Sequence, residues 1–370
     1  METNPNPSQS KPHLEDRARR VAGNHAASGL EGVTPTPLQR LPQLEDLLRE
    51  AYADFVRVSE TRGALSGVAE WLLDNFYVIQ QAIRQIQENM PPGYYQRLPK
   101  LDESSLQGYP RVYAVAREIL QSVGGQVDVD RVKRFVRAYQ EIRPLTMGEI
   151  WALPTMLRLT ILESLTRAVA EAASIEMPDT EGPLPAPVNL QMGHEASVAA
   201  SINSLRAIDT EDWDAFFEAV SLVEEALRLD PADVYAAMDF ETRDRYRGVV
   251  EELAGDVDRS EKEVADEAIR LAREQADANA GRAHPDNGFG TRSEHVGFYL
   301  IADGRDRLEE AIGYRPGPLE HLKRVIFDHP TFVYLTSIGL IVALVLVGAL
   351  AYARSVGGGT LDLLVVAAGT

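Results

Sequence analysis

Apolar residues recur every three or four positions along most of the chain from residue 41 to residue 328, which is the spacing of one face of an α-helix. The clearest stripe is formed by Leu65, Val68, Leu72, Phe76, Ile79, Ile83 and Ile86. No run alternates between apolar and polar residues long enough to demand a β-strand. The pattern therefore predicts an all-α fold, built as a multi-helix bundle.

Residues that begin or end helices divide this pattern into separate elements. The capping-box spacing S/T-x-x-E occurs at Thr146–Glu149 and at Ser260–Glu263, and each occurrence predicts a helix N-terminus. Asp230-Pro231 predicts an N-cap followed by a first-turn proline, at the start of a helix that runs to Leu253. Pro154 is expected to kink the helix after the first capping box or to move its start.

Shifts in composition predict the domain boundaries. Residues 1–40 are polar, rich in proline and without periodicity, which is typical of a disordered tail. Helical periodicity then predicts one subdomain over 41–173 and a second over 192–328. The Pro-rich segment 174–191 is expected to be the connector between them.

The C-terminal part of the chain has the pattern of a membrane anchor. The range 332–353 contains no charged residue and is long enough to cross a bilayer core. More basic residues precede it (Arg315, Lys323, Arg324) than closely follow it (Arg354), which places the helical bundle in the cytoplasm. A second apolar segment begins at 361–370. The expected architecture is thus a cytoplasmic bundle, one transmembrane helix and a truncated second one.

Composition narrows the classes of function. The chain has 37 basic and 56 acidic residues and a net charge of −19, whereas binding to nucleic-acid phosphates requires an excess of lysine and arginine. We therefore expect no nucleic-acid partner. The absence of cysteine excludes disulfides, thiolate metal sites and a cysteine nucleophile.

Motifs that carry chemistry are scarce. The seven histidines form no H-E-x-x-H pair, and neither a G-x-S-x-G elbow nor a P-loop occurs. Two D-x-D tripeptides, Asp128–Asp130 and Asp256–Asp258, have the spacing with which carboxylates hold a divalent metal. Each lies between glycine-containing sequence and the start of a helical pattern, so helix capping is the favoured interpretation. We assign no catalytic, substrate-binding or metal-ligating residue and expect no cofactor in this chain.

Several long segments resemble one known family. They are GYYQRLPKL, GYPRVYA, RFVRAYQEIRPLTMGEIWALPTMLRLTILESL, MDFETRDRYRGVVEELA and HVGFYLIADGRDRLE. These segments are similar to the region that precedes the glycosyltransferase domain in bacterial cyclic β-1,2-glucan synthases. The resemblance runs from about Trp71 to the C-terminus. It implies UDP-glucose as the donor and a cyclised glucan as the product of the complete enzymes, with the bacterial inner membrane as their location.

The motifs of the family's catalytic domain help to define the expected role of this chain. The resemblance implies a metal-holding D-x-D and an acceptor-binding Q-x-x-R-W, but no tryptophan here follows an arginine, because Trp71, Trp151 and Trp213 follow Glu70, Ile150 and Asp212. We therefore expect a non-catalytic, membrane-anchoring N-terminal portion of such a synthase, and a truncated product. Its expected partners are the bilayer and the glycosyltransferase domain. The alternative is an independent membrane-anchored adaptor or scaffold protein.

One charged helix is the candidate interaction patch. Its residues are Arg243, Asp244, Arg245 and Arg247. In a helix, Asp239 can reach Arg243 and Glu241 can reach Arg245, whereas Arg243 and Arg247 repel each other, so some of these arginines need partners on other elements. The patch is either part of an ion-paired helix packed by neighbouring apolar residues, or a surface that docks the transferase domain or a glucan.

Two further groups of residues have both a structural and a functional interpretation. The basic residues Arg131, Lys133, Arg134 and Arg137 form either a solvated helix face or a contact for acidic lipid headgroups. The tyrosines Tyr94, Tyr95, Tyr109 and Tyr113 either stack on sugars or are buried with their hydroxyl groups hydrogen-bonded.

Overall fold

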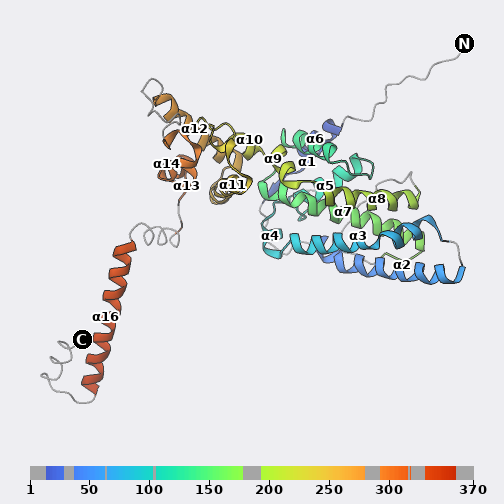
Figure 1. The fold of residues 1–370 in the computed structure, drawn as a ribbon, viewed down its shortest axis with the longest axis horizontal. Coiled ribbons are helices and arrows are strands. Elements are labelled where there is room, and N and C mark those ends of the chain that lie inside the picture. The colour runs from blue at the N-terminus through green and yellow to red at the C-terminus, as the bar shows by residue number, and fades with distance from the viewer. Residues whose placement is uncertain are drawn as a thin grey trace, which may run out of the picture. The chain divides into compact units, whose positions relative to one another are not determined.

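The computed structural model of the protein describes residues 14–28, 37–62, 65–102, 106–177, 193–279, 292–315, 317 and 330–355. The chain divides into two units, Met1–Leu308 and Glu309–Thr370, and each is described by itself. The described residues are almost entirely helical, which confirms the predicted all-α class (Figure 1). Within them, the strands are limited to one antiparallel pair, β1 (Ala27–Ser28) with β2 (Lys100–Leu101).

The first part of the first unit contains α1 (Leu14–Asn24), η1 (Pro37–Arg40), α2 (Leu41–Arg62), α3 (Gly67–Asn89), α4 (Pro92–Arg97), α5 (Arg111–Ser122), α6 (Val129–Gln140), α7 (Met147–Ala173) and α8 (His194–Thr210). It continues with α9 (Trp213–Val220), α10 (Leu222–Leu227), η2 (Tyr235–Ala237), α11 (Phe240–Gly255), α12 (Glu261–Asn279), η3 (Arg292–Glu294), α13 (Val296–Ile301) and the start of α14 (Arg305–Ile312).

Helix α7 is the centre of the core. It packs against α2, α3, α5, α8 and α9, and most of its residues are buried. The predicted capping box is present. The Thr146 side chain accepts a hydrogen bond from the Glu149 backbone N–H, and the Glu149 side chain accepts a hydrogen bond from the Thr146 backbone N–H. Pro154 therefore does not move the start of the helix, which runs through it to Ala173. Ser174 ends the helix in the left-handed conformation, with φ of 56°.

The prediction of disorder over residues 1–40 is wrong for 14–28 and 37–40. Residues Leu14–Asn24 form α1, which packs against α6 through the fully buried Ala18 and Ala22. Arg17 Nη2 lies 3.0 Å from Glu118 Oε2, and Arg19 Nε lies 2.7 Å from Glu141 Oε2. Small buried residues hold this helix in place, together with ion pairs to residues that are far away in the sequence. A stripe of large apolar side chains, which would have predicted the helix, is therefore not needed. The remaining residues of the predicted tail lie outside the described ranges.

Helix α8 packs against α3 and α7, and the three lie side by side with α2 (Figure 1). The first helix after the predicted connector thus joins the bundle that precedes the connector. Residues 178–192 lie outside the described ranges, so a division at this connector stays a prediction.

The predicted helix from Asp230 to Leu253 starts later than expected. Asp233 has φ of 55°, a left-handed conformation that a continuous α-helix does not allow. Helix α11 therefore begins only at Phe240, with Asp239 as its N-cap. Asp230 instead accepts hydrogen bonds from the backbone N–H groups of Tyr235 at 3.1 Å and Val296 at 2.9 Å. It thereby ties the loop before α11 to α13, within a group in which α12 packs against α10, α11 and α13.

The second unit contains α16 (Pro330–Ser355), which covers the range predicted as an apolar helix. Leu335 and Leu344 on this helix are more than 60% exposed, at 62% and 64%. Over the described residues, no helix meets the combined length and apolarity that crossing a bilayer requires. The predicted second apolar segment, 361–370, lies outside the described residues.

Candidate functional site

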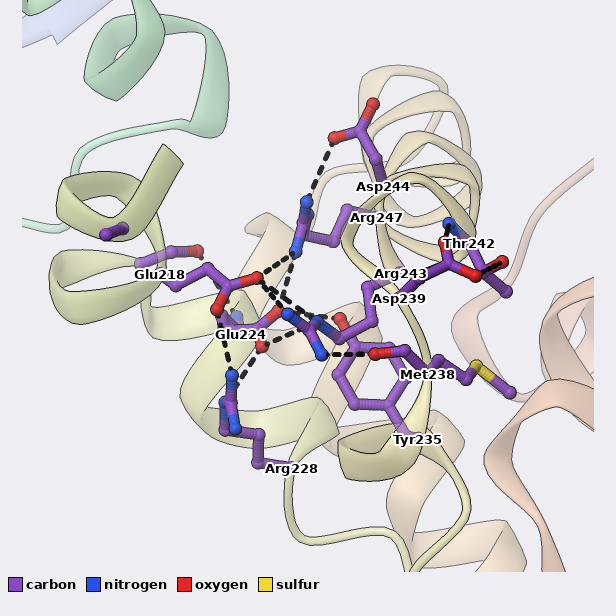
Figure 2. A network of polar contacts seen from close by, with 12 residues as sticks. Glu218, Glu224, Arg228, Tyr235, Met238, Asp239, Thr242, Arg243, Asp244 and Arg247 are labelled. Carbon is purple, nitrogen blue, oxygen red and sulfur yellow. Dashed lines mark hydrogen bonds and ion pairs between the residues drawn. The ribbon is translucent and has the colours of Figure 1, made fainter. Parts of the chain in front are cut away.

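A network of charged residues joins α9, α10 and α11. Figure 2 shows the carboxylates of Glu218 and Glu224 facing the guanidinium groups of Arg228, Arg243 and Arg247. Arg247 Nη1 lies 2.9 Å from Glu224 Oε2, and Arg228 Nε lies 2.8 Å from Glu224 Oε1. Arg243 Nε lies 3.1 Å from Glu218 Oε1. We refer to these five residues as the Arg–Glu network.

The centre of the Arg–Glu network is shielded from water. The side chain of Glu224 is fully buried and accepts a further hydrogen bond from the Tyr235 hydroxyl at 2.7 Å. The buried guanidinium of Arg247 lies 5.0 Å from the ring centroid of Phe217 and 4.7 Å from that of Phe240. Burying either charge alone would cost several kcal/mol, so the arrangement is stable only with both partners in place.

The network accounts for part of the predicted interaction patch. Arg243 and Arg247 point inward toward the carboxylates, and Asp244 Oδ1 lies 3.2 Å from Arg247 Nη2 (Figure 2). Arg245 is at the surface, where it pairs with Glu241 at 2.9 Å as the helical spacing predicts. Because Arg247 is buried, the four residues do not form one continuous docking surface.

The predicted ion pair between Asp239 and Arg243 is absent. Asp239 instead accepts a hydrogen bond from the Thr242 backbone N–H at 2.8 Å, as the N-cap of α11. Arg243 instead pairs with Glu218, and its Nη1 donates a hydrogen bond to the Met238 backbone carbonyl at 2.6 Å. A local cap therefore displaces the pair that the i, i+4 spacing predicts.

The two D-x-D tripeptides lie at helix ends. Asp128 is the N-cap of α6 and accepts a hydrogen bond from the Asp130 backbone N–H at 3.0 Å, which confirms capping at this position. Asp256 lies at the C-cap of α11, and α12 is capped by Ser260 instead of by this tripeptide. In the described parts of the chain, no group of three histidine or acidic side chains is placed to hold a metal ion.

The four basic residues of α6 that were singled out contact other elements of the same unit. Arg137 donates to the Ala219 carbonyl at 2.7 Å, Lys133 pairs with Glu211 at 3.4 Å, and Arg134 pairs with Glu15 at 3.4 Å. Arg131 donates to the Ser122 carbonyl at 3.3 Å. These contacts fasten α6 to α1, α5 and α9, so the residues do not form a uniform solvated face.

Three of the four singled-out tyrosines are buried and cannot stack on an external sugar. These are Tyr95, Tyr109 and Tyr113. The Tyr113 hydroxyl donates to Glu163 at 2.8 Å, which agrees with the structural interpretation. Tyr94 differs, because it is only partly buried and lines a cleft.

That cleft, which we call the α7 cleft, has a volume of about 760 Å³. It is lined by Tyr94 and residues 97–99, by residues 144–148 and Ile150 at the start of α7, by residues 221–223 and by parts of 248–262. The volume lies within the range of small-molecule sites in proteins.

A carboxyl group joins the two sides of the α7 cleft. Glu261, at the start of α12, accepts a hydrogen bond from the Met147 backbone N–H at 2.7 Å. Burial raises the pKa of Glu261 to about 7 against the opposing effect of this hydrogen bond, and the negative charges of Glu251 and Glu149 raise it further. Part of the Glu261 population is therefore protonated at neutral pH.

Two opposite charges face the α7 cleft from different helices. The side chains of Arg97 on α4 and Glu251 on α11 line it, and neither makes a hydrogen bond or an ion pair with any residue that the structure describes. Burial raises the pKa of Tyr94, Glu251 raises it further and Arg97 lowers it, so both charges act on that phenol. A Cβ atom at Gly148 would lie 3.8 Å from Tyr94 Cε2 and 3.9 Å from Glu251 Oε1.

The sequence reasoning missed Arg97, Glu251 and Glu261 as members of one site. They lie on α4, α11 and α12, and no spacing along the chain relates them. The one signal was Tyr94, which lies in the tyrosine-rich segment singled out for possible sugar stacking.

Comparison with known proteins confirms the resemblance described above. No protein-family model matches the chain. The chain is, however, similar to a protein of the cyclic glucan synthase class. That protein is the cyclic β-(1,2)-glucan synthase NdvB of Rhizobium meliloti (strain 1021), with 28% identity over 334 residues. The match covers 72% of this chain but only 12% of NdvB, so the chain spans about an eighth of the length of this relative.

Proposed function

We propose that this chain is a non-catalytic support and anchoring module of a cyclic β-1,2-glucan synthase. The first unit is a rigid helical support, and the segment 332–353 fastens it to the bilayer with the support on the cytoplasmic side. The similarity to NdvB supports the association with glucan synthesis. The resemblance implies that glucosyl transfer from UDP-glucose belongs to a separate catalytic domain, which this support holds in place.

The observation that supports this role is that buried ion pairs join the helices of the first unit. Arg247 and Glu224 are locked together between α10 and α11, and Arg111 Nε donates to the buried Glu149 at 2.8 Å between α5 and α7. Such pairs stabilise only one relative arrangement of the helices, because any displacement would leave a charge buried without its partner. A rigid arrangement is what a domain that positions another domain requires. The exposed Asp244 and Arg245 are the members of the predicted patch that are available for such a contact.

The bilayer contact is supported by the amino-acid sequence of α16 and by its exposed side chains. The range 332–353 has no charged residue, and the exposed large apolar residues of the helix include Leu335, Ile341 and Leu344. Exposed apolar surface of this kind is unfavourable in water and favourable in lipid. The basic residues before the segment favour a cytoplasmic first unit.

The catalytic part of the proposal is tested with the full chain in detergent micelles and radiolabelled UDP-glucose. We expect no incorporation of label into glucan or protein. Incorporation that depends on the native protein and disappears on boiling would show that the chain is itself a glucosyltransferase, and the support role would be abandoned.

The anchoring part is tested by carbonate extraction of membranes from expressing cells. The wild-type chain should remain in the membrane pellet. The variant Ile341→Arg/Leu344→Arg should move to the supernatant, because each arginine at the centre of a span costs about 3 kcal/mol. The matched control is Leu229→Arg, at an exposed apolar position of the first unit, and it should pellet like the wild type. A wild-type chain released by carbonate would contradict the anchor.

A further inference from the structure

The α7 cleft contains charges that the fold does not use. Elsewhere in the first unit, buried charges are paired, such as Arg111 with Glu149 and Arg247 with Glu224. Arg97 and Glu251 are unlike these, since they face the same cleft from α4 and α11 and neither has a hydrogen-bonding or ion-pairing partner among the described residues. A guanidinium and a carboxylate that line the same cleft offer five N–H donors and two acceptor oxygens to a molecule bound there.

The charge balance of the walls restricts the class of ligand. Acidic residues that line the cleft are Glu251, Glu252, Asp256 and Glu261, and basic ones are Arg97, Arg259 and Lys262. An anionic ligand such as a nucleotide would be repelled by the acidic group, and a cationic ligand by the basic group. An uncharged ligand that both donates and accepts hydrogen bonds meets neither repulsion. Hydroxyl groups have this property, because each is one donor and two acceptors.

The remaining lining groups suit a polyhydroxyl ligand. The partly buried ring of Tyr94 supplies an apolar surface for the C–H face of a sugar. A cleft of about 760 Å³ holds more than a single small metabolite such as a free amino acid. We infer that the α7 cleft binds a short glucan chain, with Glu251 accepting from and Arg97 donating to its hydroxyl groups. The choice of a glucan among polyhydroxyl ligands rests on the proposed function.

The inference is tested by isothermal titration of the full chain, in detergent micelles, with linear β-1,2-linked glucotetraose. Saturable binding is expected. Glu251→Gln and Arg97→Gln should each raise Kd about tenfold, because a hydrogen bond to a charged group contributes more than a neutral one. Both residues are at the surface, so circular dichroism should show an unchanged fold.

Matched controls make the same charge changes away from the cleft. Glu50→Gln on α2 and Arg84→Gln on α3 are at exposed positions, and their Kd values should stay within about twofold of the wild type. The inference is overturned if glucotetraose gives no saturable heat, if both cleft variants bind like the wild type, or if free glycine saturates the site instead. None of these results affects the support role, which fails only if the chain transfers glucose or leaves the membrane.

Discussion

The indole ring of Trp151 stacks on the ring of Phe217, with centroids 4.4 Å apart and planes inclined by 13°. Trp151 lies in the second turn of α7, and Phe217 lies on α9. This contact joins the helix at the centre of the core to the group of helices that contains the Arg–Glu network. Gln140 adds to the same junction by donating to the Val220 carbonyl at 2.8 Å.

We predict that Phe217→Ala lowers the free energy of unfolding by about 3 kcal/mol, because it removes a buried aromatic ring and its stacking partner's contact. Denaturant unfolding of the full chain, followed by far-ultraviolet circular dichroism, measures this change. Tyr77→Ala is the control, since Tyr77 is an exposed aromatic residue. It should change the free energy of unfolding by less than about 1 kcal/mol. Equal effects of the two variants would contradict the junction.

For the Arg–Glu network, we predict that Arg247→Met costs about 3–5 kcal/mol of unfolding free energy, because it leaves the Glu224 carboxylate buried without its main partner. The double variant Arg247→Met/Glu224→Gln should recover part of this loss. Arg245→Met, on the exposed side of the same helix, should change stability by less than about 0.5 kcal/mol. A double variant that loses the full sum of both single changes would show that the two residues are not coupled.

From the raised pKa of Glu261 we predict a specific dependence of the free energy of unfolding on pH. Its pKa in the folded protein is raised from 4.5 to about 7, so folding favours the protonated carboxyl. The stabilising contribution is therefore complete below about pH 4.5 and is lost as the pH rises through 7. Relative to Glu261→Gln, the wild type should lose about 2 kcal/mol of unfolding free energy between pH 5 and 8, after allowance for partial exposure to solvent.

Burial also raises the pKa of Glu163 to about 7. The comparison of the wild type with Glu261→Gln separates the contribution of Glu261 from that of Glu163, because Glu163 is present in both proteins. Glu263 is the control on the same helical turn. Hydrogen bonds from Ser260 lower its pKa, so Glu263 stays ionised over the tested range and Glu263→Gln should leave the slope of stability against pH unchanged. A wild type and a Glu261→Gln variant with parallel profiles would contradict the assignment.

Helix α1 should be a stable part of the first unit. We predict that the amides of residues 18–24, which follow the first turn of α1, are protected from hydrogen exchange, and that Ala22→Glu removes this protection because it places an unpaired charge where α1 meets α6. Arg20→Glu is at an exposed position and should keep the protection. Rapid exchange throughout α1 in the wild type would restore the interpretation of this segment as disordered.

Local signals in the sequence were sufficient for the class of fold and for several helix ends. The capping box at Thr146–Glu149 and the cap at Asp128 involve groups within one helical turn, so they act in the same way whatever surrounds the helix. Helical periodicity is equally local, and it predicted α3 through its apolar stripe. Helix α1 was missed because its order depends on Arg17 reaching Glu118, a partner on another helix.

What the sequence by itself determined, then, is that the described chain is helical, where many of its helices begin, and that it resembles a cyclic glucan synthase. Only the tertiary structure decided which charges are paired and which face a cleft. Arg243 binds Glu218 because Asp239 is already used as a helix cap, and Arg97 and Glu251 line one cleft because α4 and α11 are brought to the same end of α7. The physical reason is that helix formation is driven within a few residues, whereas ion pairs and clefts depend on atoms that approach one another only after the helices pack.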